Sequence, residues 1–425
     1  MKYSVITFGC RVNQADSLGF EEELLQAGAA PAPPEEADLV VVNTCSVTAS
    51  ADQGARQTIR RIARSNPTAR IIVTGCYATR QPADVAALPN VLRVVPNDDK
   101  PRLVSLVRNV RLQPDSQIST AERFGDGEGS CGARIEPGVA GRTAFTLRVQ
   151  TGCDEECSYC IIPSTRGRPR SVPVESVLKE AARVATAGFK EIVLTGVHLG
   201  SYGRDLSPRS SLFELLAALS RVRGDLLFRI SSLEPMDCSR EIVDLVASSV
   251  SLAPHFHLPL QHASDRVLSA MGRPYTIAYY SGLADYVRLR VPEASIGTDV
   301  IVGFPGETDR DFDALASYLE GSPLTHVHVF PYSDRPGTRA ATMGGAVPGP
   351  IVRARARQVR EISQRLAERF HDSQVGTVHQ GLTLQDGSLV VTGNYLKLRI
   401  AAGRRRNEWV RVRVTSDHDG ELLPG

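Results

Sequence analysis

The 425-residue sequence contains no uninterrupted apolar run near the roughly 18 residues that a membrane-spanning helix needs. Its first ten residues, MKYSVITFGC, lack the basic stretch and long apolar segment of a secretory leader. We therefore expect a cytoplasmic protein with no membrane partner. The formal net charge is only +2, which by itself says nothing about nucleic acid, because acidic helices can balance a local basic surface.

The composition is ordinary, with 42% hydrophobic and 23% charged residues, and it disfavours disorder, collagen and coiled coil as overall classes. A chain of this length is expected to form two to four domains. The eight cysteines are the feature to explain. In a long cytosolic chain they fit metal binding or catalysis better than a disulfide framework.

Residues 1–112 contain three apolar runs, YSVITF, ADLVVVNT and ARIIVTG, separated by helix-like stretches. This alternation predicts an α/β domain whose parallel sheet is covered on both faces. Each run leads into a cysteine: Cys10, Cys45 and Cys76. Because ligands gather beyond the carboxyl ends of parallel strands, the three thiols are predicted to converge there. The alternative is that they are small buried residues of the core.

Residues 113–142 are rich in glycine, serine and proline and predict a linker, in which we expect Cys131 to be incidental. Residues 143–350 carry six strand-like segments, most of them separated by amphipathic stretches, and predict a partial (βα)6 barrel. Ser171 is a candidate cap for the first helix of this domain, which is predicted to end at Gly188.

Residues 351–370 predict a basic helix, and residues 371–425 alternate apolar and polar residues between glycine turns, as in a small β-barrel. A basic strip with interleaved aromatics in this domain suits phosphate contacts and base stacking. The residues expected to bind RNA are Tyr395, Lys397, Arg399, Arg404, Arg405, Arg406 and Trp409. Arginines of the helix, among them Arg355, Arg365 and Arg369, favour this interpretation over a solvated hairpin with buried aromatics.

The sequence TGCDEECSYC arranges Cys153, Cys157 and Cys160 as CxxxCxxC directly after the first strand of the middle domain. Three thiolates on one loop can bind three irons of a [4Fe-4S] cluster and leave the fourth iron open. Structural zinc needs four ligands, and no fourth Cys or His falls near this triplet in the sequence. A redox dithiol would use only two of the three cysteines.

This spacing resembles the radical S-adenosylmethionine (SAM) superfamily, whose cluster binds SAM and cleaves it to a 5′-deoxyadenosyl radical. The resemblance implies SAM contacts from Tyr159, Gly196, Ser232 and Glu234, although a packed loop residue, turn glycines and capping residues are alternatives. Arg166, Arg168 and Arg170 follow the last cysteine of the loop and can hold SAM or RNA phosphate, or simply cap and solvate the loop. Asp299, at a strand end, can contact substrate or act structurally.

The two cysteine triplets followed by a small β domain resemble the radical SAM methylthiotransferase family across nearly the whole chain. The resemblance implies that Cys10, Cys45 and Cys76 bind a second [4Fe-4S] cluster and that residues 371–425 are a TRAM-like RNA-binding domain. One cluster would generate the radical from SAM and the other would hold the sulfur to be inserted. An electron donor and a sulfur source are then required from outside the chain.

Within that family, TFGCRVNQADS, LTGVHLGSYGRDL, FPYSDRPGTRAATM and TGNYLKLRI are most similar to the subgroup that modifies N6-threonylcarbamoyladenosine at tRNA position 37. Enzymes for isopentenyladenosine or for a ribosomal-protein aspartate share the architecture. A two-cluster electron carrier or iron-sulfur protein that binds RNA, or a zinc-dependent RNA-binding module, are alternatives of other classes. QHASD departs from the usual QSGSD, so His262 is a candidate substrate contact, whereas Cys238 is expected to be incidental.

Overall fold

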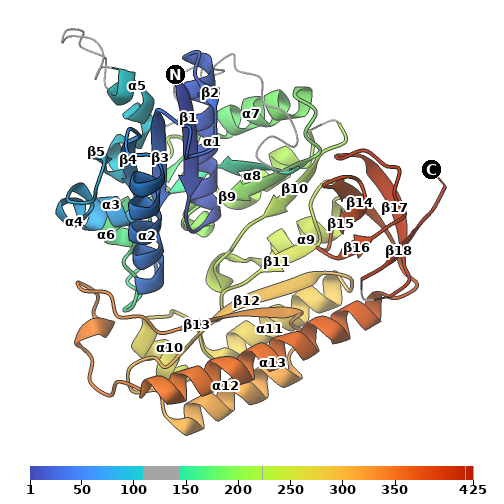
Figure 1. Ribbon diagram of the computed structural model, residues 1–425. Helices are drawn as coiled ribbons and strands as arrows, with labels where there is room; N and C mark the ends of the chain where they lie inside the picture. The colour runs from blue at the N-terminus through green and yellow to red at the C-terminus, as the bar shows by residue number, and fades with distance from the viewer. Residues whose placement is uncertain (109–142, 223, 417, 425) are drawn as a thin grey trace.

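The computed structural model describes residues 1–108, 143–222, 224–416 and 418–424. The predicted linker and Cys131 lie outside these residues. Within them, the chain forms an N-terminal α/β layer, a partial βα barrel and a C-terminal antiparallel sheet (Figure 1). No helix in the described ranges has the length and apolar character needed to cross a lipid bilayer.

The N-terminal domain is built on a parallel sheet of order β2-β1-β3-β4-β5. The three predicted runs form β1 (Lys2–Thr7), β3 (Leu39–Thr44) and β4 (Arg70–Gly75), and every residue of β3 is buried. The short edge strands β2 (Ala30–Pro31) and β5 (Val91–Val95) were not predicted. The helices are α1 (Arg11–Gln26), α2 (Ala49–Ser65), α3 (Cys76–Arg80), α4 (Pro82–Ala86), η1 (Asn97–Arg102) and α5 (Leu103–Arg108).

The middle domain confirms the predicted six-stranded partial barrel. Its parallel strands form two three-stranded sheets, β10-β9-β6 and β11-β12-β13, and single bridges from Phe228 to Leu252 and from Ser232 to His257 join β10 to the segment that ends in β11. The strands are β6 (Phe145–Arg148), β9 (Glu191–Thr195), β10 (Leu227–Ile230), β11 (His255–His257), β12 (Ser295–Val302) and β13 (His326–Pro331). A two-stranded ribbon, β7 (Gln150–Thr151) with β8 (Arg170–Ser171), flanks them.

Helices cover the outside of this barrel and bury one continuous hydrophobic core against the strands. They are α7 (Val174–Thr186), η3 (Leu199–Ser201), α8 (Leu212–Leu219), η4 (Pro235–Asp237), α9 (Arg240–Ser248), α10 (Asp265–Met271), α11 (Ile277–Arg290) and α12 (Asp309–Gly321). Two further short helices contribute nothing to this core: α6 (Ile162–Arg166), which contacts the N-terminal domain, and η5 (Ala340–Thr342). Ser171 does not cap α7, because Pro173 is its N-cap residue. The Ser171 hydroxyl instead donates to Asp205 Oδ1 (2.6 Å).

The C-terminal domain follows a helix that is longer than predicted, α13 (Gly349–Gln374). Its strands form a curled antiparallel sheet of order β16-β15-β14-β17-β18, in agreement with the expected small β-barrel. They are β14 (Val378–Leu384), β15 (Leu389–Thr392), β16 (Lys397–Arg399), β17 (Trp409–Val414) and β18 (Gly420–Leu422). The backbone N–H of Arg399 donates to His418 O (2.7 Å), which brings the two edges of the sheet together.

Charged side chains join the N-terminal domain to the barrel. Asp16 of α1 is buried, and its carboxylate accepts from Lys100 of η1 (2.6 Å), from Arg148 of β6 and from Arg166 of α6 (3.4 Å). Burial opposes ionisation of Asp16, but the three cations outweigh it and hold the pKa of this carboxyl well below its usual range. The relative position of the two domains is therefore fixed by a buried ion cluster.

We expect Asp16→Ala to destabilise the protein by about 3–5 kcal/mol, because Lys100 and Arg166 would remain buried without their anionic partner. Anaerobic calorimetry of the unfolding transition measures the change. Asp98→Ala is the matched control, since its ion pair with Arg170 joins the same domains but Asp98 is 76% exposed, so its loss costs less than about 1 kcal/mol. Equal effects of both substitutions would contradict this account.

Candidate active site

The structure brings together the three cysteines at the strand ends of the N-terminal domain. Cys10 is the N-cap residue of α1, Cys45 follows β3, and Cys76 begins α3 directly after β4. A Cβ added to Gly9 would lie 2.6 Å from the Cys45 sulfur, so only glycine allows Cys10 and Cys45 to approach in this way. Burial and the neighbouring thiols of Cys76 and Cys10 raise the pKa of Cys45 to about 11.

Positive charge surrounds the third of these cysteines. Burial would raise the pKa of Cys76, but Arg166 and Lys100 outweigh it and hold this pKa below its ordinary value. The Asn97 amide donates to Cys76 Sγ (3.8 Å) and to the Thr165 carbonyl (2.8 Å). The Cys76 thiolate is thus stabilised by residues of both domains. Arg166, considered for SAM or RNA phosphate from the sequence, is buried beside this triad.

The CxxxCxxC loop follows β7 and is held by backbone hydrogen bonds. Ser158 N donates to Met271 O (2.9 Å), and Ala340 N donates to Ser158 O (2.8 Å), so the segment between Cys157 and Cys160 is fixed on both sides. The backbone N–H of Ile162 donates to Cys160 Sγ (3.4 Å). Burial, reinforced by the neighbouring thiols, raises the pKa of Cys160 to about 12.

Two residues that the sequence did not single out contact this second triad. Arg273 donates to Cys157 Sγ (3.0 Å) and forms an ion pair with Glu234. His198 Nδ1 lies 3.9 Å from Cys153 Sγ, while its Nε2 contacts Asp237 Oδ2 (2.7 Å). Burial opposes protonation of His198, but hydrogen bonds to Asp237 and Cys153 raise its pKa to about 10. Cys157 and Cys153 therefore each have a cationic neighbour.

The four residues expected to contact SAM lie in different surroundings. Tyr159 packs against the small cluster of Val267, Met271, Phe304 and Ala340 and also lines a cavity. Gly196 follows β9, and a Cβ there would lie 2.9 Å from Gln150 Oε1. Ser232 Oγ is 2.9 Å from His257 Nδ1, and Glu234 is held by Arg273. Their roles toward SAM stay predictions.

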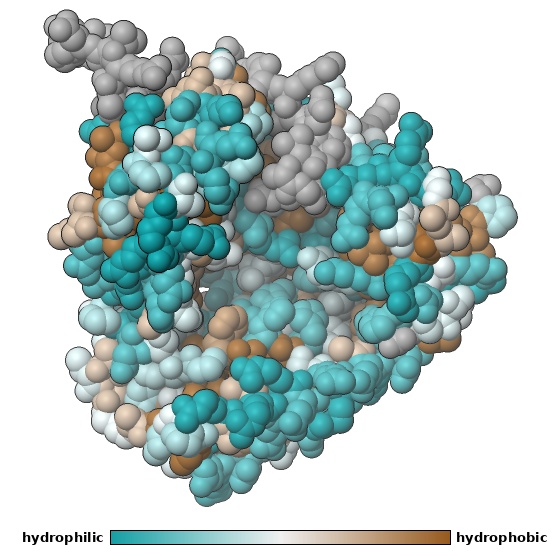
Figure 2. Space-filling model, viewed as in Figure 1, coloured by the Kyte–Doolittle hydropathy of each residue, from teal (hydrophilic) through white to brown (hydrophobic). Residues whose placement is uncertain are grey.

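A cavity of about 190 Å³ is shared by the N-terminal domain and the barrel. Val47 and Thr48, which follow Cys45, line one side, and Cys160 with Ile161 and Ile162 lines another. The remaining wall comes from β12, β13 and adjacent residues: Gln261, Asp299, Ile301, Phe330, Pro331, Tyr332 and Ser333. Figure 2 shows that this face of the molecule is hollowed between the N-terminal domain, the C-terminal sheet and the segment of β12 and β13.

Hydrogen bonds across the domains hold the walls of this cavity. The backbone N–H of Ala49 donates to Ser333 Oγ (3.1 Å), and Arg335 donates to the Val47 carbonyl (3.2 Å) and to Asp52 (2.8 Å). The loop that carries Cys45 is therefore tied to the loop after β13. Separate domains thus contribute to one shared site.

The donor atoms at both triads suit iron-sulfur clusters. All six sulfurs belong to free cysteines, and each triad offers three thiols, enough to hold three irons of a cubane cluster. Burial and the neighbouring thiols make Cys45 and Cys160 costly to ionise when no metal is bound, and a bound metal reverses that preference. Hydrogen bonds from Asn97, Arg273 and the Ile162 amide to cysteine sulfurs are the kind that tunes such clusters.

The basic strip of the C-terminal domain is only partly free for RNA. The Tyr395 ring stacks under Arg229 (4.6 Å to the ring centroid), and its hydroxyl accepts from Arg11 (3.0 Å). Trp409 Nε1 donates to the Asp225 carbonyl (3.0 Å). Both aromatics thus contact other domains, while Lys397, Arg399, Arg404 and Arg405 are exposed. The RNA-binding role of all seven residues, including Arg406, stays a prediction.

Other sequence candidates have structural surroundings. Arg355 is buried between Glu307 and Asp309, and Arg365 and Arg369 contact Glu320, so these arginines join α13 to the barrel. His262 is fully buried, which lowers its pKa to about 4, and it is not among the residues that line the cavity. Cys238 is buried in the barrel core, while Arg168 is exposed.

The fold and the two thiol triads define a protein of the radical SAM class. Residues 147–319 match the model of the radical SAM superfamily, and residues 2–96 match that of uncharacterized protein family UPF0004. Among solved structures, the radical SAM methyltransferase TsrM from Kitasatospora setae has a TM-score of 0.56 with 16% identity. The match covers 80% of this chain and 77% of that one and shows a shared fold.

Full-length relatives identify the family. The threonylcarbamoyladenosine tRNA methylthiotransferase MtaB of Aquifex aeolicus is 35% identical over 97% of this chain and 100% of its own length. The tRNA-2-methylthio-N6-dimethylallyladenosine synthase of Carboxydothermus hydrogenoformans is 31% identical over 99% of this chain and 95% of its own. The chain belongs to the radical SAM methylthiotransferase family, as its cysteine pattern predicted.

Proposed function

We propose that this enzyme replaces the C2 hydrogen of N6-threonylcarbamoyladenosine, at tRNA position 37, with a methylthio group. It would hold one [4Fe-4S] cluster through Cys153, Cys157 and Cys160 and another through Cys10, Cys45 and Cys76. The observation that carries this proposal is the cavity lined both by Cys160 and by the residues that follow Cys45, because sulfur insertion into a C–H bond needs a radical source and a sulfur carrier close to one substrate.

The chain's own residues have three tasks at these centres. Arg273 and His198 would orient and stabilise the thiolates of the second triad, and Glu234 holds Arg273 in place. Tyr159, Gly196 and Ser232 are proposed to position SAM. The bound cluster with SAM supplies a 5′-deoxyadenosyl radical, which can abstract hydrogen from an aromatic carbon that no acid or base could deprotonate at neutral pH.

The walls of the cavity would bind the target base. Ile161, Ile301 and Phe330 offer apolar surface to a flat purine, and a base bound there would displace water from them. Exposed Lys397, Arg399, Arg404 and Arg405 would contact the phosphates of the tRNA outside the cavity. Electrons and sulfur would come from a donor and a source outside the chain, and a second molecule of SAM would donate the methyl group.

Nucleoside mass spectrometry tests the proposal. Reconstituted protein, SAM, reductant and sulfide are incubated anaerobically with tRNA that carries either threonylcarbamoyl or dimethylallyl at adenosine 37. We expect the methylthio product from the threonylcarbamoyl tRNA. Conversion of the dimethylallyl tRNA alone would favour a second candidate function, methylthiolation of dimethylallyladenosine. The 31% identity to the dimethylallyladenosine enzyme supports that candidate. SAM cleavage without methylthio product from either tRNA would contradict both.

A further inference from the structure

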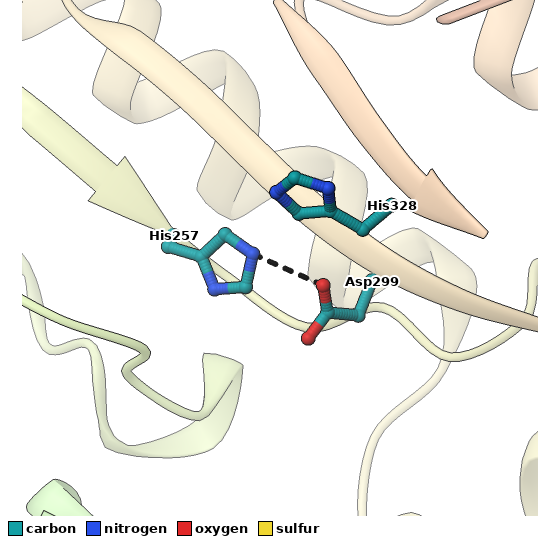
Figure 3. A group of neighbouring side chains, drawn as sticks. All are labelled: His257, Asp299 and His328. Atoms are coloured by element: carbon teal, nitrogen blue, oxygen red, sulfur yellow. Dashed lines mark ion pairs between the residues drawn. The ribbon is translucent and has the colours of Figure 1, made fainter. Parts of the chain in front are cut away.

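Three polar side chains meet inside the second half of the barrel. His257 ends β11, Asp299 lies in β12 and His328 lies in β13, where it is the register partner of Asp299. One potential ligand atom from each lies within 4.8 Å of the others. Figure 3 shows the three side chains pointing toward one another from neighbouring strands.

The first of these residues is fully engaged by the protein. His257 Nδ1 contacts Ser232 Oγ (2.9 Å), and His257 Nε2 contacts Asp299 Oδ1 (3.1 Å). This chain of contacts holds the Asp299 carboxylate in one orientation. His257 is therefore a positioning residue for Asp299 rather than a group available to a ligand.

The other two residues keep hydrogen-bonding capacity. Asp299 Oδ2 and both ring nitrogens of His328 have no hydrogen-bond partner among the residues that the structure describes. The Asp299 side chain is 25% exposed, and His328 is exposed. The site thus offers one free acceptor next to one free donor, both open to a ligand.

This pair adjoins the cavity shared by the N-terminal domain and the barrel. Asp299 is itself part of the cavity wall. Side chains alternate along a strand, so His328 shares a face of β13 with Phe330, and Asp299 shares a face of β12 with Ile301. Phe330 and Ile301 both line the cavity. A base held against these apolar residues would direct a substituent toward Asp299 and His328.

The relatives are named for two N6 substituents of adenosine, threonylcarbamoyl and dimethylallyl. The two differ in whether they carry hydrogen-bonding groups that could pair with Asp299 and His328. A threonylcarbamoyl group carries urea N–H donors together with hydroxyl and carboxylate acceptors. A dimethylallyl group carries neither, so it would cover Asp299 without replacing the hydrogen bonds that water makes to it. Sites built to hydrogen-bond a substrate reject analogues that lack the matching polar group.

We infer that Asp299 and His328 recognise the polar N6 substituent of the target adenosine, with Asp299 accepting from its N–H groups and His328 donating to its carboxylate or hydroxyl. The inference rests on the proposed function and assigns its substrate specificity to two residues. Ser232 and His257 act through Asp299.

The test uses three anticodon stem-loop RNAs that differ only in the target adenosine, which is unmodified or carries threonylcarbamoyl or dimethylallyl. Dissociation constants, KM, kcat and 5′-deoxyadenosine formation are measured for the unaltered protein, Asp299→Leu and His328→Leu. We expect each variant to weaken binding and raise KM for the threonylcarbamoyl RNA by about 10- to 100-fold. Affinity for the other two RNAs is expected to be unchanged or improved, with SAM cleavage retained.

Asp285→Leu, on the exposed outer face of α11, is the matched control and should leave all values unchanged. Equal losses for all three RNAs, or loss of SAM cleavage in the variants, would overturn the inference. So would a divalent metal other than iron that binds the unaltered protein and is lost in both variants, since two histidines and a carboxylate also suit a metal. Failure of the unaltered protein on the threonylcarbamoyl RNA would instead overturn the proposed function.

Discussion

Cys157→Ala is expected to reduce formation of 5′-deoxyadenosine from SAM by more than about 100-fold, to the level seen without enzyme. Removal of a residue that contacts a metal ligand lowers metal affinity or activity by about 10–100-fold, and loss of the ligand itself lowers it further. The other two cysteines of the loop cannot hold three irons of a cubane. Anaerobic reduction with SAM, followed by chromatography of the products, measures the effect.

Iron content separates this explanation from misfolding. The unaltered protein should contain about eight irons and Cys157→Ala about four, because the Cys10, Cys45 and Cys76 site is intact. Cys238→Ala is the control, since this thiol is buried in the barrel core away from both triads. It should keep full iron content and full SAM cleavage. Retention of cleavage in Cys157→Ala would exclude the radical SAM assignment of this loop.

Cys45→Ala is expected to abolish methylthio product while much of the SAM cleavage remains. Val47 and Thr48, which follow Cys45, line the cavity, but Cys45 is not among the residues that hold the CxxxCxxC loop, which makes backbone contacts to Met271 and Ala340. Nucleoside mass spectrometry and 5′-deoxyadenosine yield, measured in the same reaction, give the ratio of the two activities. Iron should again fall to about half.

The reciprocal variant provides the comparison for this result. Cys157→Ala loses both activities, whereas Cys45→Ala loses only sulfur insertion. If Cys45→Ala lost both to the same extent, the two triads would not divide the chemistry as proposed. If it retained methylthio product, the N-terminal triad would have no role in sulfur transfer.

The sequence predicted the convergence of cysteines well because strand periodicity determines where a parallel sheet ends. β1, β3 and β4 were evident as continuous apolar runs. They are adjacent in the sheet, so Cys10, Cys45 and Cys76 lie together at the carboxyl ends of these strands. The edge strands β2 and β5 were missed because β2 has only two residues and β5 is half exposed. Short edge strands contain too few residues to show a hydrophobic pattern.

Residues that act across long sequence separations could not be predicted. Arg273 lies 116 positions from Cys157 and belongs to no motif, and its role follows only from the packing of α10 beside the loop. Nothing in the sequence indicates that Lys100 and Arg166 gather around Asp16. The aromatics Tyr395 and Trp409 fitted RNA stacking by composition, but sequence could not show that both lie at domain contacts.

The ion cluster around Asp16 sets a limit on how the enzyme can admit its substrate. Swinging the N-terminal domain away from the barrel would break the contacts from Arg148 and Arg166 to a single carboxylate together. The distance between the two sulfur triads is therefore fixed, and the two domains are not expected to open and close around a substrate. A substrate would then have to enter through the existing hollow without domain opening, so the residues that line the cavity would decide which substrates are accepted.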